Sequence, residues 1–198
     1  MNLLAHFYLS HATPSLIVGS FLGDFVKGKQ YEKYDSSIVK GILLHREVDY
    51  FTDFHPTFLK SKRRLVDQHR HYAGVIVDIF YDHFLAKNWK EYSEIPLKAF
   101  TQQVYRTLHQ QHALLPTKAQ RVLHYMSQHN WLLHYAKLDG IAKTLQGMEK
   151  RSPYSNQMGS ATRDLQDDYE DYEQEFSGFF AEIQKHSQDW LGKRPSAQ

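Results

Sequence analysis

The sequence contains no cysteine, which excludes disulfide bonds, thiolate metal sites and a catalytic thiol. This composition agrees with a reducing compartment, and residues 1–10 lack the basic segment of a signal peptide, so we expect a cytoplasmic protein. No run of about eighteen apolar residues occurs, so we expect no membrane-spanning segment. The charges nearly balance, with 24 Lys and Arg against 22 Asp and Glu, and they give no argument for nucleic acid binding.

Glycine and proline are also sparse, with 10 and 6 residues among 198, and no stretch alternates as a β-strand does. Apolar residues recur instead at helical spacing. We therefore predict an all-α, single-domain helical bundle over residues 1–198, with a loop over residues 150–160. The expected helices cover residues 14–28, 36–53, 71–87, 96–111, 117–128, 131–148 and 163–186.

Charge is spread unevenly along the chain. Residues 25–75 contain ten basic and six acidic side chains, whereas residues 164–175 contain seven acidic side chains and no basic one. The basic segment serves either solubility or the docking of an acidic partner, and the pattern does not choose between these. The acidic run is typical of a solvent-exposed helix face.

Polar residues interrupt the predicted helix over residues 36–53 at a regular spacing. At about 100° per residue, His45, Asp49 and Asp53 continue the stripe that Ile38 and Ile42 begin. The other sides of this helix are apolar as well, so we expect it to be buried nearly all round. Because burying an unpaired carboxylate is costly, these acids need partners or a cation.

The helix expected over residues 71–87 repeats this arrangement. Asp78 and Asp82 share a stripe with His71 and Val75, while His83 lies about 100° away from Asp82. The neighbouring side chains are again almost all apolar. This helix therefore also brings carboxylates inward.

Two further polar residues lie in apolar surroundings near the N-terminus. Asp24 follows the small residues Gly19, Ser20 and Gly23, which allow another helix to approach closely, so we expect Asp24 against a neighbour rather than in water. His6 lies within the apolar run of residues 3–7.

Together these segments offer oxygen and nitrogen ligands without sulfur, which suit Mn, Mg, Fe or Zn. The predicted metal ligands are Asp24, His45, Asp49, Asp53, Asp78, Asp82 and His6.

Each of these residues also has a structural explanation as a helix cap, an ion-pair partner or a hydrogen-bonded core group. Arg46, next to His45, could likewise hold a substrate phosphate from the edge of the site or pair with one of the acids. The residues alone leave these alternatives open.

Five separated blocks resemble the acyl carrier protein phosphodiesterase (holo-acyl-carrier-protein hydrolase) family of bacteria. The blocks are NLLAH at 2–6, GSFLGDFVKG at 19–28, GILLHREVD at 41–49, TDFH at 52–55 and DIFYDHFL at 78–85. The likeness returns more weakly at residues 131–133 and 147–151. Ser20 departs from the pattern, since we expect Asn there in many members.

The resemblance implies a fold like that of the HD-domain metal phosphohydrolases. It implies hydrolysis of holo-acyl carrier protein to the apo protein and 4′-phosphopantetheine, within fatty acid biosynthesis and lipid metabolism, with Mn²⁺ as the metal and Mg²⁺ as a substitute. The family's site, carried over, falls on the metal ligands named above and on His83, and includes Arg46.

The roles that follow remain predictions. A metal-activated water would attack phosphorus, and His83 or His45 would protonate the leaving serine oxygen. The expected catalytic residues are Asp24, His45, Arg46 and His83, and the expected substrate-binding residues are Lys27, Lys62, Arg63 and Arg64. Two other functions stay open: an HD-type phosphohydrolase acting on a nucleotide or other small phosphoester, and a non-enzymatic module that binds carrier protein.

Overall fold

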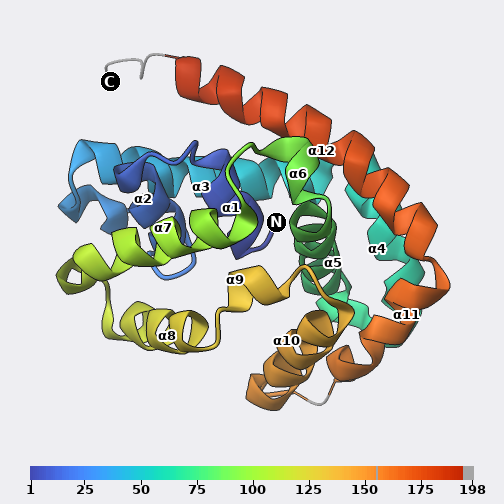
Figure 1. The fold of residues 1–198 in the computed structure, drawn as a ribbon. Coiled ribbons are helices and arrows are strands. Elements are labelled where there is room, and N and C mark those ends of the chain that lie inside the picture. Colours follow the sequence, from blue (N-terminus) through green and yellow to red (C-terminus); the bar gives the residue numbers. More distant parts are fainter. Residues whose placement is uncertain (155, 194–198) are drawn as a thin grey trace.

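The protein is described by a computed structural model that covers residues 1–154 and 156–193. Within these ranges the chain forms helices and connecting turns without a strand, which confirms the all-α prediction (Figure 1). The α-helices, in chain order, are α1 (Leu3–Leu9), α2 (Pro14–Gly23), α3 (Ser36–Phe54), α4 (Pro56–His69), α5 (Ala73–Lys87), α6 (Trp89–Tyr92), α7 (Leu97–Gln110), α8 (Thr117–Gln128), α9 (Trp131–His134), α10 (Leu138–Arg151), α11 (Ala161–Asp167) and α12 (Tyr169–Gly192).

Short 3₁₀ turns join several of these helices. They are η1 (Gln30–Lys33), η2 (Arg70–Tyr72), η3 (His112–Leu114) and η4 (Met158–Ser160). None of the helices in the described ranges is both long enough and apolar enough to cross a membrane.

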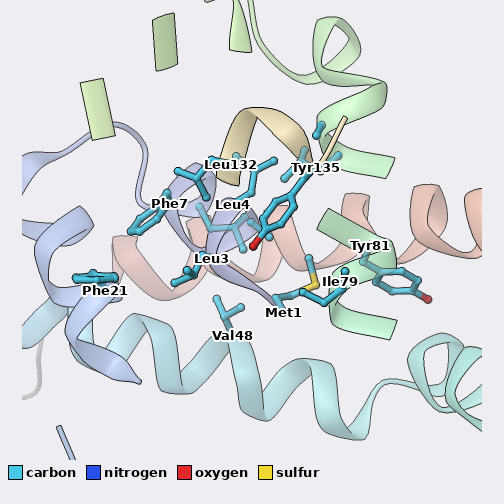
Figure 2. Close-up of a cluster of buried hydrophobic side chains, with 14 of the residues drawn as sticks. Met1, Leu3, Leu4, Phe7, Phe21, Val48, Ile79, Tyr81, Leu132 and Tyr135 are labelled. Atoms are coloured by element: carbon cyan, nitrogen blue, oxygen red, sulfur yellow. The ribbon is translucent and has the colours of Figure 1, made fainter. Parts of the chain in front are cut away.

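Helix α1 lies at the centre of the core although it has only seven residues. Leu4, Ala5 and Phe7 on this helix are fully buried. Figure 2 shows α1 surrounded by apolar side chains of α2, α3, α5 and α9, namely Phe21, Val48, Ile79 and Leu132. Each large apolar side chain buried in this way contributes about 1.5–3 kcal/mol, so the middle of the bundle holds the N-terminal segment firmly in place.

Helices α2 and α3 approach each other closely because glycines face each other at their crossing. A Cβ atom on Gly19 would lie 2.6 Å from the Cα of Gly41, and one on Gly41 would lie 2.7 Å from the carbonyl oxygen of Leu16. Larger residues would therefore push the two helices apart. The close approach that the small residues of α2 predict is confirmed.

The helix boundaries differ from the sequence predictions in places. Helix α2 ends at Gly23 rather than near Gly28, which instead adopts a positive φ of 54° in the following loop. The helix expected over 131–148 is divided into α9 and α10, because Lys137 is extended. The helix expected over 163–186 is divided at Asp168.

Three helices, α1, α4 and α6, were not anticipated. Helices α1 and α6 are too short for a periodic pattern, and α4 begins directly at Pro56, a residue type that often occupies the first position of a helix. Between α10 and α11, the predicted loop contains η4, and position 155 of this loop lies outside the described residues. Positions 194–198 of the expected domain also lie outside them.

The acidic run on α11 and α12 was expected to be a solvent-exposed helix face. Several of its side chains instead form ion pairs with α4 and α5. The buried carboxylate of Glu175 accepts hydrogen bonds from Ser61 and Arg64 and lies 2.9 Å from the ammonium of Lys60. Arg64 also stacks over the ring of Tyr172. Helix α12 thus packs along α3, α4 and α5 and closes one side of the bundle (Figure 1).

Candidate metal centre

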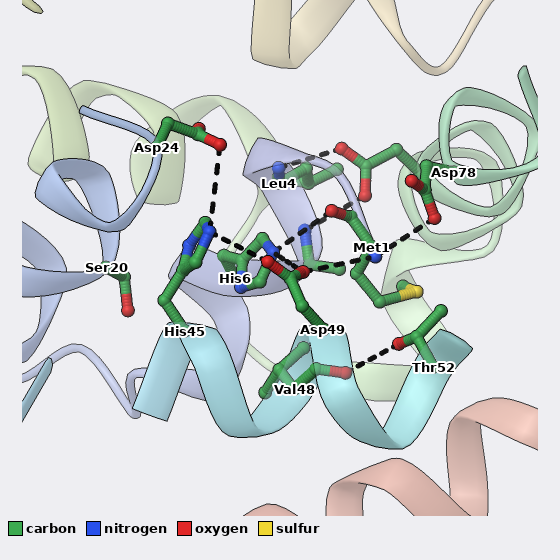
Figure 3. A network of polar contacts seen from close by, with 12 residues as sticks. Met1, Leu4, His6, Ser20, Asp24, His45, Val48, Asp49, Thr52 and Asp78 are labelled. Carbon is green, nitrogen blue, oxygen red and sulfur yellow. Dashed lines mark hydrogen bonds and ion pairs between the residues drawn. The ribbon is translucent and has the colours of Figure 1, made fainter. Parts of the chain in front are cut away.

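Three side chains from α1 and α3 converge beside the core. The Nε2 atoms of His6 and His45 lie 3.1 Å from the two carboxylate oxygens of Asp49, as Figure 3 shows. The two imidazole rings stack with centroids 3.8 Å apart. One ligand atom from each of the three residues lies within 4.8 Å of the other two, which is close enough for one ion to reach all three.

The electrostatics of the cluster favour the protonation states that bind a metal. Burial, and then the neighbouring His45, lower the pKa of His6 to about 3, so its ring is neutral near pH 7. Burial alone would raise the pKa of Asp49, but hydrogen bonds from His45 and His6 outweigh it and hold that pKa well below its usual range. A neutral imidazole and an ionised carboxylate are the forms that coordinate cations.

Asp24 and Asp78 lie on opposite sides of this cluster. An oxygen of Asp24 lies 3.7 Å from Nε2 of His45, and its side chain is 52% exposed, so it forms the open edge of the site rather than packing away from water as expected. Asp78 of α5 reaches the cluster through the ammonium nitrogen of Met1, which lies 3.0 Å from Asp78 and 3.7 Å from Asp49 (Figure 3). Burial raises the pKa of Asp78, although this ammonium opposes the shift.

The local sequence explains why His45 can point into the cluster. Its ring lies against the last turn of α2, where a Cβ atom on Gly23 would come within 2.3–2.8 Å of the His45 side chain. Asp24 follows directly, at the C-terminal end of α2. The glycine therefore allows His45 and Asp24 to occupy the same corner of the site.

The structure gives Asp82 a different position from that expected. Its carboxylate accepts hydrogen bonds from the backbone amides of Leu4 and Ala5, at 2.8 and 3.1 Å, and so satisfies the first turn of α1. Burial raises the pKa of Asp82 to about 7, although these amide bonds oppose the shift. Asp53 is exposed one turn beyond Asp49 and also lies outside the cluster of three ligands.

His83 does not face the cluster either. Its Nδ1 donates a hydrogen bond of 2.7 Å to the carbonyl oxygen of Tyr135, and its Nε2 accepts one of 2.8 Å from the hydroxyl of Tyr169. Burial lowers the pKa of His83. Both ring nitrogens are thus used to join α5 to the segments after α9 and at the start of α12.

The predicted substrate-binding residues are scattered. Arg46 donates hydrogen bonds of 2.9 Å to the carbonyl oxygens of Val26 and Gly28, so it holds the loop after α2, and within residues 1–154 and 156–193 it forms no ion pair with an acid. Lys27 is exposed on that loop. On α4, Arg63 is exposed, Lys62 is half-buried and Arg64 is bound to Glu175. The structure therefore does not bring Lys27 and the α4 residues together.

The donor set fits a divalent metal ion. Two imidazoles and a carboxylate, with Asp24 at the open edge, are typical ligands of Mn²⁺, Fe²⁺ or Zn²⁺. In the described chain, the buried Nδ1 atoms of His6 and His45 have no hydrogen-bond partner, so each can carry the proton when Nε2 binds a cation. Sequence reasoning could not find the stacking of the two rings, because it did not anticipate α1.

A family model and individual relatives with the same description match this chain. The family model described as "Acyl carrier protein phosphodiesterase" matches residues 1–183. A protein of that name from Serratia proteamaculans is 32% identical over 190 residues, which cover 96% of this chain and 98% of that protein. One from Photorhabdus laumondii is 33% identical, covering 91% of each chain, and one from Escherichia coli O6:H1 is 31% identical, covering 94% of this chain and 97% of that protein.

No solved structure matches the chain, so its likeness to HD-domain proteins stays a prediction. The match to the family model extends across nearly all of the described helices, including those that carry His6, His45, Asp49 and Asp78. The chain therefore belongs to the acyl carrier protein phosphodiesterase family.

Proposed function

We propose that this protein hydrolyses holo-acyl carrier protein to apo-acyl carrier protein and 4′-phosphopantetheine, using Mn²⁺ held by His6, His45 and Asp49. The observation that supports this proposal most strongly is the convergence of two imidazole Nε2 atoms on Asp49, in a chain that belongs to this family. Mg²⁺ is the expected substitute. The reaction would take place in the cytoplasm, as part of lipid metabolism.

Several residues of the chain would then act directly on the substrate. A divalent ion held in the cluster supplies a Lewis acid for the phosphoryl oxygens and lowers the pKa of water. Asp24, at the open edge 3.7 Å from His45, would orient the attacking water and accept its proton, which then passes to the serine oxygen that leaves phosphorus. Lys27, exposed on the same loop, binds a phosphate oxygen.

Other predicted residues would act by holding these groups in place. Arg46 fixes the loop that carries Lys27, since it binds the carbonyl oxygens on either side of that residue. Asp82 anchors α1, and with it His6, through the amides of Leu4 and Ala5. His83 joins α5 to its neighbours and takes no part in proton transfer.

Mass spectrometry of holo-acyl carrier protein incubated with the protein and Mn²⁺ tests this function. Loss of the phosphopantetheine mass from the carrier is the expected result. Substitution of Asp24 or Asp49 by Ala should lower turnover by about 100-fold or more, whereas the exposed Asp139→Ala on α10 should leave it unchanged. Hydrolysis of nucleotides with an unchanged carrier, or binding without turnover, would contradict the proposal.

A further inference from the structure

Two aromatic side chains stand exposed on α3 beside the metal cluster. Tyr50 is 65% and Phe54 68% exposed, and their ring centroids lie 4.9 Å apart. They directly follow Asp49 and Asp53 in the sequence. At about 100° per residue they therefore lie on the flank of α3 next to the carboxylate stripe. Adjacent exposed aromatic rings of this kind are characteristic of surfaces that bind a partner.

The same flank continues toward the start of α3 as an apolar hollow. This hollow has a volume of about 810 Å³, and its lining includes Tyr31, Tyr34, Leu43 and Trp190. Leu43 precedes Tyr50 by two helical turns and so lies on the same side of α3. A strip thus extends along this side of α3 from the hollow to the aromatic pair, and Glu47, which lies 2.7 Å from His186 of α12, interrupts its apolar character between them.

Basic side chains border the strip on the loop between α2 and α3. Lys27, Lys29 and Lys33 are exposed, as are Glu32 and Asp35 on the same loop, and among the described residues none of the three lysines forms an ion pair. Arg46 ties Gly28 to the turn of α3 that precedes Tyr50, which brings this loop close to the aromatic pair. On α4, by contrast, Lys60 and Arg64 are neutralised by Glu175, so that helix offers less positive charge to a partner.

The position of this strip matches what the chemistry requires. In the reaction proposed above, the bond that breaks joins phosphorus to a serine oxygen of the carrier polypeptide itself. The carrier must therefore contact the protein directly beside the metal cluster. Asp24 begins the loop that carries the lysines, and Asp49 precedes Tyr50, so the strip borders the site on α3 and on this loop.

We propose that this surface, the α3 flank (Tyr31, Tyr34, Leu43, Tyr50 and Phe54 with Lys27, Lys29 and Lys33), docks the polypeptide of the carrier protein. This inference rests on the proposed function. The flank fits an acidic protein surface that presents a few apolar side chains, since its aromatic rings bury the apolar groups and its lysines pair with the acids. Of the residues predicted to bind substrate it keeps Lys27 and leaves out Lys62, Arg63 and Arg64 of α4, while Lys29 and Lys33 also belong to the basic segment over residues 25–75.

Binding of apo-acyl carrier protein, which has no phosphopantetheine ester to cleave, tests the docking surface separately from catalysis. We expect Tyr50→Ser/Phe54→Ser and Lys29→Glu/Lys33→Glu each to weaken this binding about tenfold or more, measured by calorimetry. In the double variant Lys29→Glu/Lys33→Glu, the affinity should also depend less on salt concentration than in the wild type. In both double variants, KM for holo-acyl carrier protein should rise more than kcat falls.

Matched controls carry equivalent changes elsewhere on the surface. Tyr125→Ser on α8 and Lys90→Glu on α6 replace an exposed aromatic and an exposed lysine remote in sequence from the flank, and both should bind like the wild type. Stabilisation of each variant by Mn²⁺ shows that the fold and the metal cluster are intact. Wild-type affinity in both double variants would overturn the docking surface.

The outcomes separate the docking surface from the proposed function. If the wild type releases phosphopantetheine but the flank variants keep its KM, the docking surface is wrong and the function stands. If the wild type binds apo-acyl carrier protein through the flank but leaves holo-acyl carrier protein uncleaved, the function is wrong and the docking surface stands. If the wild type does neither, both are wrong.

Discussion

The imidazole rings of His6 and His45 lie face to face, with centroids 3.8 Å apart and planes inclined by 15°. Two protonated rings would repel each other at this distance, and burial already lowers the pKa of His6 to about 3. The neutral imidazole of His6 beside an ionised Asp49 forms a site that a cation would stabilise. The geometry therefore leads to predictions about metal binding as well as catalysis.

Mn²⁺ should stabilise the folded protein through this cluster. At a concentration 100 times its Kd, a ligand that binds only the folded state adds about 2.7 kcal/mol to the free energy of unfolding. We expect Asp49→Asn to lose most of the increase in Tm on addition of Mn²⁺, because it removes the charged ligand. His124→Asn, at an exposed position on α8, is the control. An increase in Tm as large in Asp49→Asn as in the wild type would contradict the metal site.

Adding a methyl group at Gly23, which is not itself a predicted ligand, should displace the imidazole ring of His45 in the metal cluster. In Gly23→Ala the new Cβ would lie 2.3 Å from a ring carbon of His45, so the imidazole must move. We expect the affinity for Mn²⁺, measured by calorimetry, to fall by about tenfold or more.

Gly178→Ala on α12 is the matched control, since nothing lies within 4 Å of a Cβ atom there. It should keep the metal affinity and raise stability by about 0.5–1 kcal/mol, because alanine favours a helix. Unchanged affinity in Gly23→Ala would show that His45 is not a ligand in the position described.

Periodicity in the sequence placed two members of this cluster on the same side of one helix. It placed His45 and Asp49 one turn apart on an apolar helix, and the structure brings their side chains within 3.1 Å of each other. The same spacing on α5 suggested equal roles for Asp78 and Asp82. Periodicity describes one helix at a time, however, and it could not show that Asp82 meets the amides at the start of α1.

For the same reason, periodicity could not predict which segments far apart in the sequence form ion pairs. Arg64 and Glu175 are separated by 111 residues, and each belongs to a run of like charge that alone resembles a solvent-exposed surface. Only the packing of α12 against α4 shows that Lys60 and Arg64 pair with Glu175. The predicted docking segment over residues 25–75 therefore included basic side chains that are already paired, and the structure directs attention to the α3 flank.

His83 should contribute to stability rather than to turnover. Loss of its bonds to Tyr135 and Tyr169 in His83→Asn should lower the free energy of unfolding by about 2 kcal/mol, measured by urea denaturation. Turnover of holo-acyl carrier protein should change by less than about threefold, whereas removal of a general acid costs about 100-fold or more. If His83→Asn remains folded and its turnover falls about 100-fold or more, His83 would be the general acid, as the sequence predicted.

Glu175 should make the stability of the protein depend on pH. Burial alone would raise its pKa, but the hydrogen bonds from Arg64, Ser61 and Lys60 outweigh it and lower that pKa. Because the folded-state pKa lies below the unfolded value of 4.5, the contribution of the carboxylate is present above pH 4.5 and is lost as the pH falls through the folded-state pKa.

Glu175→Gln should therefore lower the free energy of unfolding by about 3 kcal/mol at pH 7, since it leaves Arg64 without its main partner. The difference from the wild type should narrow as the pH falls below 4.5 and through the folded-state pKa of Glu175, because the wild-type carboxylate then becomes neutral as well. Urea denaturation at several pH values measures both quantities, with the exposed Glu170→Gln on the same helix as control. A difference that stays constant with pH would mean that packing, rather than charge, joins α12 to α4.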